Sequence, residues 1–105
     1  MKRTAIEAAK KAILAWLDDN DPFRTQGPHV PAKIRRALGI EKSVFDATCL
    51  ELLKTGTVYM APHDHPHRLP AAEREELVAD ASGTFYCSIS DRRPALALPA
   101  EAIPA

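Results

Sequence analysis

A chain of 105 residues is long enough for one small domain with a modest core, and too short for two. With 46% hydrophobic and 27% charged residues, it has the composition of a globular protein rather than a disordered one. The formal net charge is zero, from 14 basic and 14 acidic residues, so the chain as a whole has no positive excess that would by itself attract nucleic acid.

The hydropathy of the sequence argues against a membrane or secreted protein. No apolar run approaches the length of a membrane span, and no secretory n-region and h-region open the sequence. We therefore expect a cytoplasmic protein without a membrane partner. Cys49 and Cys87 each fall within the apolar pattern of a separate segment, which favours reduced core residues over a disulfide.

Residues 3–19 are predicted to form an amphipathic helix. Its apolar residues recur at helical spacing: Ile6, Ala9, Ile13, Trp16 and Leu17. Leu14 falls among charged residues on the other side, where we expect it to be exposed and available for a contact between two copies. Asn20-Asp21-Pro22 ends the helix, and residues 20–29 form a loop rich in Pro, Gly and polar side chains.

The next two segments predict a helix-turn-helix. Pro31 suits the first position of a helix over residues 31–38, and Gly39 suits the left-handed position that ends it. Ser43 is a candidate N-cap for the following helix, with Asp46 completing a capping box, and Gly56 closes that helix. Its predicted buried face consists of Phe45, Thr48, Cys49, Leu52 and Leu53.

Two strands follow, separated by a long connection. Residues 57–60 alternate as one strand and residues 84–89 as another, with Phe85, Cys87 and Ile89 expected on one face. The prolines of residues 61–70 exclude a regular central strand there, and Pro70 can start a short helix over residues 71–78. From Asp91 onward no structural period is visible.

The order helix, helix, helix, strand, long connection, strand resembles that of the winged-helix superfamily. The Leu-Gly-Ile turn at 38–40, the spacing of Phe45, Leu52 and Leu53, and the Lys-Thr-Gly-Thr-Val exit at 54–58 are similar to those of bacterial winged-helix regulators. The implied fold is α+β: a three-helix core with a helix-turn-helix, plus a two-stranded antiparallel wing carrying a long connection with a short extra helix. We expect this domain over residues 1–90 and a flexible Pro/Ala-rich tail over residues 91–105.

The resemblance implies that the second helix of the motif enters the major groove of double-stranded DNA. Its predicted outward face consists of Ser43, Asp46, Ala47, Leu50 and Lys54. Lys42 and Ser43 at the helix start can reach phosphates or bases, and Ala47 can touch a thymine methyl. Asp46 and Glu51 fit less well, since carboxylates repel phosphates. The alternative is that this face meets a protein.

Basic residues outside that helix are candidates for contacts to the DNA backbone. Lys33, Arg35 and Arg36 cluster on the helix before the turn, and Arg68 lies in the wing. Such contacts fix the position of a protein on DNA without reading its sequence. Further candidates are Arg3, Lys10 and Lys11 on the first helix, and Arg92 and Arg93 after the last strand. Solvated surface charge is the alternative for each of them.

The run His63-Asp64-His65-Pro66-His67 is the most unusual composition in the chain. In an extended conformation His63, His65 and His67 would share a face, and imidazoles are common ligands of Zn²⁺ or Ni²⁺. A structural zinc site needs four ligands, usually including cysteine, and both cysteines are assigned to the core. We therefore favour hydrogen bonds from these side chains to an irregular wing, and expect no metal and no cofactor.

These patterns predict a small sequence-specific DNA-binding protein, a transcriptional regulator that forms a homodimer. No Gly-rich phosphate loop, nucleophile elbow or pair of CxxC motifs points to an enzyme. A winged-helix protein–protein interaction module, an adaptor subunit of a larger assembly, is the alternative, and a metal-sensing regulator is a weaker third. DNA binding gains if Lys33, Arg35, Arg36, Lys42 and Arg68 converge on one surface, and the adaptor gains if acidic residues lie among them.

Overall fold

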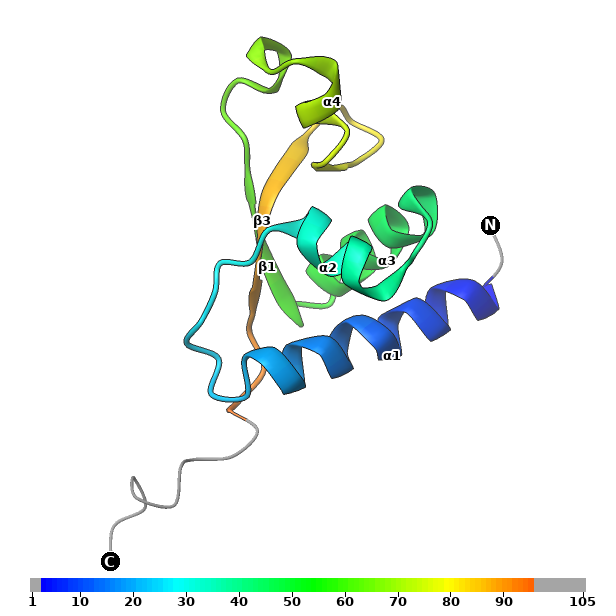
Figure 1. The fold of residues 1–105 in the computed structure, drawn as a ribbon, viewed down its shortest axis with the longest axis vertical. Coiled ribbons are helices and arrows are strands. Elements are labelled where there is room, and N and C mark those ends of the chain that lie inside the picture. The colour runs from blue at the N-terminus through cyan, green and yellow to red at the C-terminus, as the bar shows by residue number, and fades with distance from the viewer. Residues whose placement is uncertain (1–2, 96–105) are drawn as a thin grey trace, which may run out of the picture.

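Residues 3–95 of the chain are described by a computed structural model, in which three long helices lie on one side of a small antiparallel sheet (Figure 1). The elements in chain order are α1 (Arg3–Asn20), α2 (Pro31–Leu38), α3 (Lys42–Lys54), β1 (Val58–Pro62), a 3₁₀ turn η1 (Pro66–Arg68), α4 (Ala71–Arg74), β2 (Val78–Ala79) and β3 (Phe85–Asp91). The fold class is α+β, as the sequence predicts.

The bounds of α2 match the prediction, and Gly39 has the left-handed φ of 64° that ends it. α3 begins earlier than predicted, because Glu41 rather than Ser43 is its N-cap residue. The predicted capping box is wrong: the Ser43 hydroxyl donates to the Glu41 carboxylate, and Asp46 pairs with Lys42. Lys42, one turn before Asp46, binds the carboxylate that a capping box would place on the backbone N–H of residue 43.

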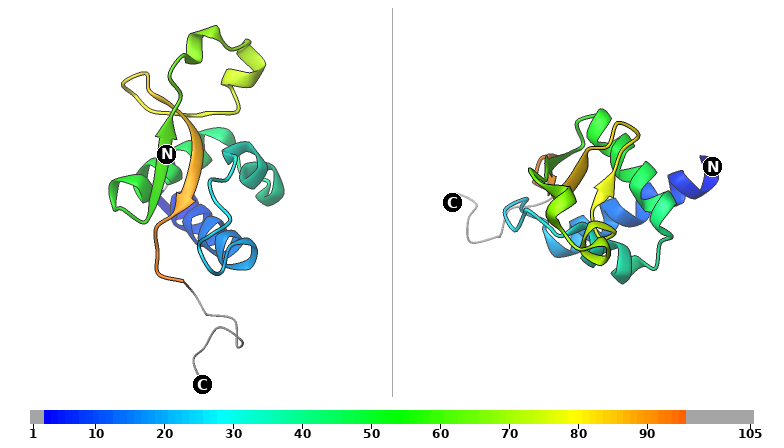
Figure 2. Two further views of the ribbon diagram at one scale, coloured as in Figure 1. Left: turned by 90° about the vertical axis from the view of Figure 1, so that its left-hand side faces the viewer. Right: turned by 90° about the horizontal axis from the view of Figure 1, so that it is seen from above.

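The sheet has the order β1-β3-β2, with both pairs antiparallel. The loop before α2 adds a single bridge to β3, in which His29 N–H donates to Ile89 O (2.7 Å) and Ile89 N–H donates to His29 O (2.9 Å). β3 is therefore paired along both edges, and Figure 2 shows it passing in front of the helical layer. The last strand of the chain is thus the centre of the sheet.

The predicted common face of Phe85, Cys87 and Ile89 is wrong. Ala61 is opposite Ser88 but Pro62 is opposite Tyr86, so the register shifts and Cys87 has no partner on β1. Of the predicted three, only Ile89 belongs to the buried cluster, and Tyr86 packs against that cluster instead. The Phe85 ring meets the His67 ring edge-on, with 6.3 Å between centroids.

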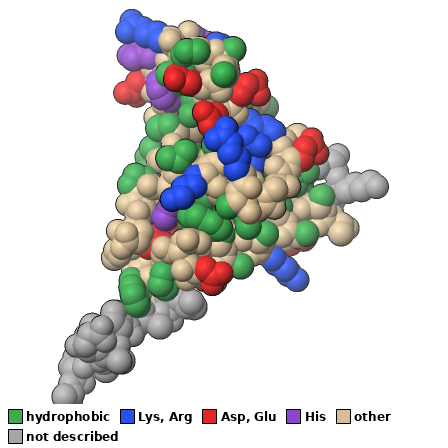
Figure 3. All heavy atoms as spheres, viewed as in Figure 1, with side chains coloured by type: hydrophobic (Ala, Val, Ile, Leu, Met, Phe, Trp, Pro, Cys, Tyr) green, Lys and Arg blue, Asp and Glu red, His purple; other side chains and the backbone are tan. Residues whose placement is uncertain are grey.

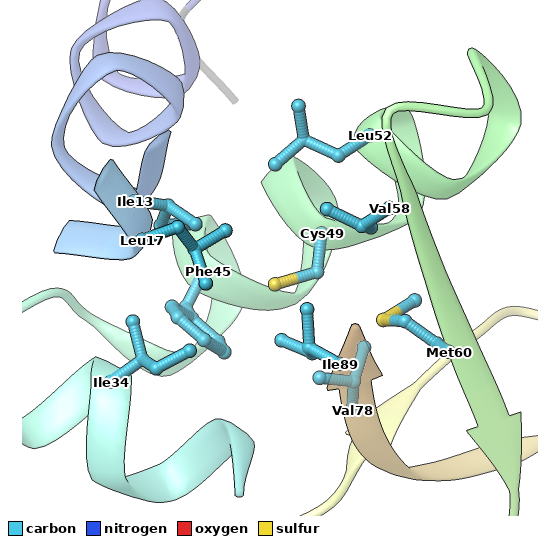
Figure 4. Close-up of a cluster of buried hydrophobic side chains, with 10 residues drawn as sticks. All are labelled: Ile13, Leu17, Ile34, Phe45, Cys49, Leu52, Val58, Met60, Val78 and Ile89. Carbon is cyan, nitrogen blue, oxygen red and sulfur yellow. The ribbon is translucent and has the colours of Figure 1, made fainter. Parts of the chain in front are cut away.

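The core lies between the sheet and the three long helices (Figure 4). Its members come from six elements: Ile13, Leu17, Ile34, Phe45, Cys49, Leu52, Val58, Met60, Val78 and Ile89. Leu14 packs against this cluster and is half-buried, which corrects the prediction of an exposed leucine. Both cysteines are free.

The connection between β1 and β3 is more irregular than predicted. Of the helix predicted over residues 71–78, only Ala71–Arg74 are helical, because the chain enters β2 at Val78. At the other end, the folded domain extends beyond residue 90. Asp91 ends β3 with its side chain fully buried, and Arg93 bonds to Asp91 and Asp18. Residues 96–105 of the predicted tail lie outside the described residues.

We expect Ile89→Val to lower the free energy of unfolding by about 0.5–1.5 kcal/mol, because it removes one methylene from a closely packed site. Ile89 is 1% exposed, at the centre of the sheet. Val30→Ala is the control, since Val30 is 58% exposed, and it should change the free energy by less than about 0.5 kcal/mol. Urea denaturation measures both; equal losses would contradict the placement of Ile89.

Candidate nucleic-acid interface

The outward side of α3 carries four of its five predicted contact residues. Ser43, Ala47, Leu50 and Lys54 recur at spacings that keep them on one face of a helix. Ser43 and Lys54 are exposed, whereas Ala47 and Leu50 are half-buried. Leu50 also packs against the core. The face is therefore a narrow strip, small and apolar in the middle, with a hydroxyl at one end and an amine at the other.

Asp46 and Lys42 are held against β2 instead of facing outward. The Lys42 ammonium pairs with the Asp46 carboxylate and also donates to Leu77 O (2.8 Å). Ala79 N–H approaches the same Asp46 oxygen at 3.4 Å. The other Asp46 oxygen is buried without a hydrogen-bond partner. These two residues fasten the start of α3 to β2.

The basic residues of α2 differ in whether they form ion pairs with other residues. Lys33 is exposed and Arg35 is half-buried, and neither forms an ion pair with any described residue. Arg36 pairs with Glu76, two residues before β2, at 2.7 Å. Figure 3 shows Lys and Arg side chains gathered near the middle of this face, with Asp and Glu side chains beside them. Arg68 is exposed on η1, away from α2 along the hairpin connection (Figure 1).

The candidate interface therefore mixes charges of both signs. Glu76 forms an ion pair with Arg36, Asp46 forms one with Lys42, and Glu41 accepts a hydrogen bond from Ser43. Acidic side chains therefore lie among the five basic residues whose convergence would favour DNA, and by that criterion the alternative of a protein-interaction module gains support.

Two basic residues of α1 bind an acidic residue of α3. Arg3 and Lys10 both bond to the Glu51 carboxylate, Lys10 at 3.0 Å, and Glu7 joins the group. Hydrogen bonds from Arg3, which contributes most, and from Lys10 lower the pKa of Glu51 to about 2. Glu51, which fits poorly at a DNA interface, thus has an internal role.

The most buried charged groups lie elsewhere and carry no sequence motif. Arg24 is almost fully buried and contacts Asp18 at 2.8 Å and Asp91 at 3.2 Å. Arg93 reaches the same two aspartates, each at 2.9 Å. The hydrogen bond from Arg24, with the charge of Arg93, keeps the pKa of Asp18 below its ordinary value. Arg93, predicted as a possible DNA contact, is therefore already bound to two aspartates within the fold.

Asp21 organises the loop next to this cluster. Its side chain accepts Thr25 N–H (2.7 Å) and Gln26 N–H (2.9 Å), and lies 3.0 Å from the His29 ring, which meets Trp16 edge-on. Burial by itself would raise the pKa of Asp21, but the hydrogen bonds from Gln26, His29 and Thr25 outweigh it and lower the pKa. This carboxylate shapes the loop that delivers His29 to the sheet.

The three histidines between β1 and α4 are not gathered into one ligand set. His65 N–H donates to His63 Nδ1 (3.0 Å), and His67 faces Phe85. Within residues 3–95, no group of three or more His, Cys, Asp or Glu side chains is arranged to hold a metal ion. The same residues contain no helix that is both long and apolar enough to span a membrane.

Asp21→Ala should lower the free energy of unfolding by about 1.5–3 kcal/mol near neutral pH, because two backbone donors lose a charged acceptor. Since folding lowers the Asp21 pKa, this stabilisation is present above the ordinary aspartate pKa of about 4 and is lost as the pH falls below it. Urea denaturation at pH 7 and pH 3 should show the gap between variant and wild type narrowing in acid. The control is Asp19→Ala, at an exposed aspartate; a gap of constant size would contradict this account.

Comparison of the chain with protein-family models, with curated proteins and with solved structures gives no match. The resemblance to winged-helix proteins therefore stands on the order of helices and strands and on the quoted segments of sequence.

Proposed function

We propose that this protein is a winged-helix transcriptional regulator that binds double-stranded DNA in the cytoplasm, with the outward strip of α3 in the major groove. The order of elements supports the winged-helix assignment, as does the single His29 bridge that joins the loop between α1 and α2 to β3. The connection from β1 to β3 corresponds to an enlarged wing.

The observations that carry this proposal are the outward strip of α3 and the cations without an ionic partner on α2, the helix that precedes it in the chain. Lys33 and Arg35 have no ionic partner among the described residues, so they can neutralise phosphates without first breaking a contact. Lys54 and Arg68 are also exposed. Contacts of this kind fix the position of α3 over the base edges without reading them.

The chemistry of the strip limits how it can read sequence. The Ser43 hydroxyl can donate to or accept from a base edge, and Ala47 and Leu50 can contact thymine methyl groups. Among the side chains that commonly bind guanine or adenine through two hydrogen bonds, α3 contains no Arg, Asn or Gln and only two lysines, of which Lys42 is held by Asp46. We therefore propose that sites rich in thymine methyl contacts are preferred.

We also propose that the protein acts as a homodimer, because one small module buries too little surface for operator-level affinity. Leu14 packs against the core, so another exposed surface would have to form the dimer contact.

Four phosphate contacts, from Lys33, Arg35, Lys54 and Arg68, predict a slope of log K against log salt of about −3.6, or roughly a hundredfold loss of affinity between 50 and 200 mM salt. Lys33→Ala should make the slope shallower by about 0.9. Lys33→Arg keeps the positive charge at the same exposed site and should leave the slope unchanged. Binding to random duplex DNA across a salt series measures all three proteins.

Absence of binding by the wild type at 50 mM salt would overturn the DNA proposal. The second candidate, a protein–protein interaction module, would then be favoured. Its specific support is that acidic groups already neutralise Arg36 and Lys42 at the interface. Under this alternative, Ser43→Arg on the α3 strip should abolish capture of a partner protein in pull-downs, whereas Lys11→Ala should not.

A further inference from the structure

We propose that Glu76 is a built-in competitor for DNA phosphate at Arg36, so that the hairpin connection lowers the affinity of the interface on which it rests. This inference rests on the proposed function and adds Arg36, once Glu76 is displaced, to the phosphate contacts named there. A carboxylate and a phosphate both accept hydrogen bonds from a guanidinium through a pair of anionic oxygens, and they cannot accept from the same N–H groups of Arg36 together.

The fold holds Glu76 in place to compete. The chain passes from α4 to β2 through residues 75–77, and the β2 side of that passage is attached to α3. Leu77 O accepts from Lys42, and Ala79 N–H approaches Asp46. Glu76 lies just before these two contacts, and its carboxylate is 2.7 Å from the Arg36 guanidinium. The ion pair is thus supported by neighbouring contacts on α3.

The ion pair is exposed, so DNA can break it. The Arg36 side chain is 63% exposed and the Glu76 side chain 37%. Ion pairs at such exposure are weak, and the competition should reduce DNA affinity by about twofold to fivefold, without preventing binding. Glu76 would therefore set the strength of binding and leave the mode of binding unchanged.

The adjacent acid provides a matched control. Glu75 is exposed and forms no ion pair with any described residue. Glu75→Gln and Glu76→Gln change the net charge of the protein equally and lie one residue apart. Any general effect of removing a negative charge near DNA appears in both variants, and the competition at Arg36 appears only in the second.

The experiment measures the Kd of wild type, Glu75→Gln, Glu76→Gln, Arg36→Ala and the double variant Arg36→Ala/Glu76→Gln for random duplex DNA at 100 mM salt. Glu76→Gln should bind about twofold to fivefold more tightly than Glu75→Gln. In the Arg36→Ala background that extra gain should vanish, because the residue under competition is gone. Circular dichroism checks that each variant is folded.

Each result decides between the two proposals. If wild type binds DNA and the two Glu→Gln variants gain equally, the competition is overturned and the proposed function stands. A gain for Glu76→Gln that persists without Arg36 also overturns the competition. If neither the wild type nor any variant binds DNA even at 50 mM salt, the proposed function and the competition are both overturned.

Discussion

The structure depends on the pairing of β3 along both of its edges. Ile89 exchanges two backbone hydrogen bonds with His29 on one edge, and lies opposite Met60 of β1 on the other. This strand brings the loop before α2, the exit from α3 and the end of the hairpin into one sheet, over which the three long helices can bury their apolar faces. Because β3 is the last strand, these pairings are separated by up to about sixty residues, which makes the loop-closure entropy of folding substantial. Asp91 at the end of β3 then anchors Arg24 and Arg93, so the strand also organises the buried charges.

A neutral protein can still leave cations available when its internal ion pairs are distributed unevenly. Six basic residues are held in ion pairs within residues 3–95: Arg3, Lys10, Arg24, Arg36, Lys42 and Arg93. They serve different purposes. Arg3 and Lys10 on α1 hold α1 to α3. Arg24 and Arg93 bind Asp91 at the end of β3. Arg36 and Lys42 hold the connection between β1 and β3 to α2 and α3. Lys33 and Arg35 remain uncommitted on α2, so the local charge beside α3 is more informative about partners than the net charge of the chain.

The enlarged hairpin is what separates this fold from a minimal three-helix domain with a two-stranded wing. Its base is fastened to α3 through Lys42 and Asp46, and to α2 through Glu76. The start of α3 is therefore coupled to the connection between β1 and β3. Any ligand that meets α2 and α3 must either accommodate or displace the acidic side chains of this connection, and this favours partners that can compete for a guanidinium.

The sequence by itself determined the helices, because the helical periodicity of apolar residues, Pro31 and Gly39 act within a few residues of each other. It also indicated two strands and the irregular, proline-rich connection. The tertiary structure decided what depends on distant partners: the bulge that turns Tyr86 inward in place of Cys87, the His29 bridge, and the burial of Leu14. The candidate site divides in the same way. Helical spacing correctly placed Ser43, Ala47 and Lys54 on one face, and it is compatible with the pair of Lys42 and Asp46. In addition, Ala79 approaches Asp46 and Glu76 binds Arg36, each from about thirty to forty positions away. No local pattern specifies such pairs, because a charged side chain takes whichever opposite charge the completed fold brings within reach.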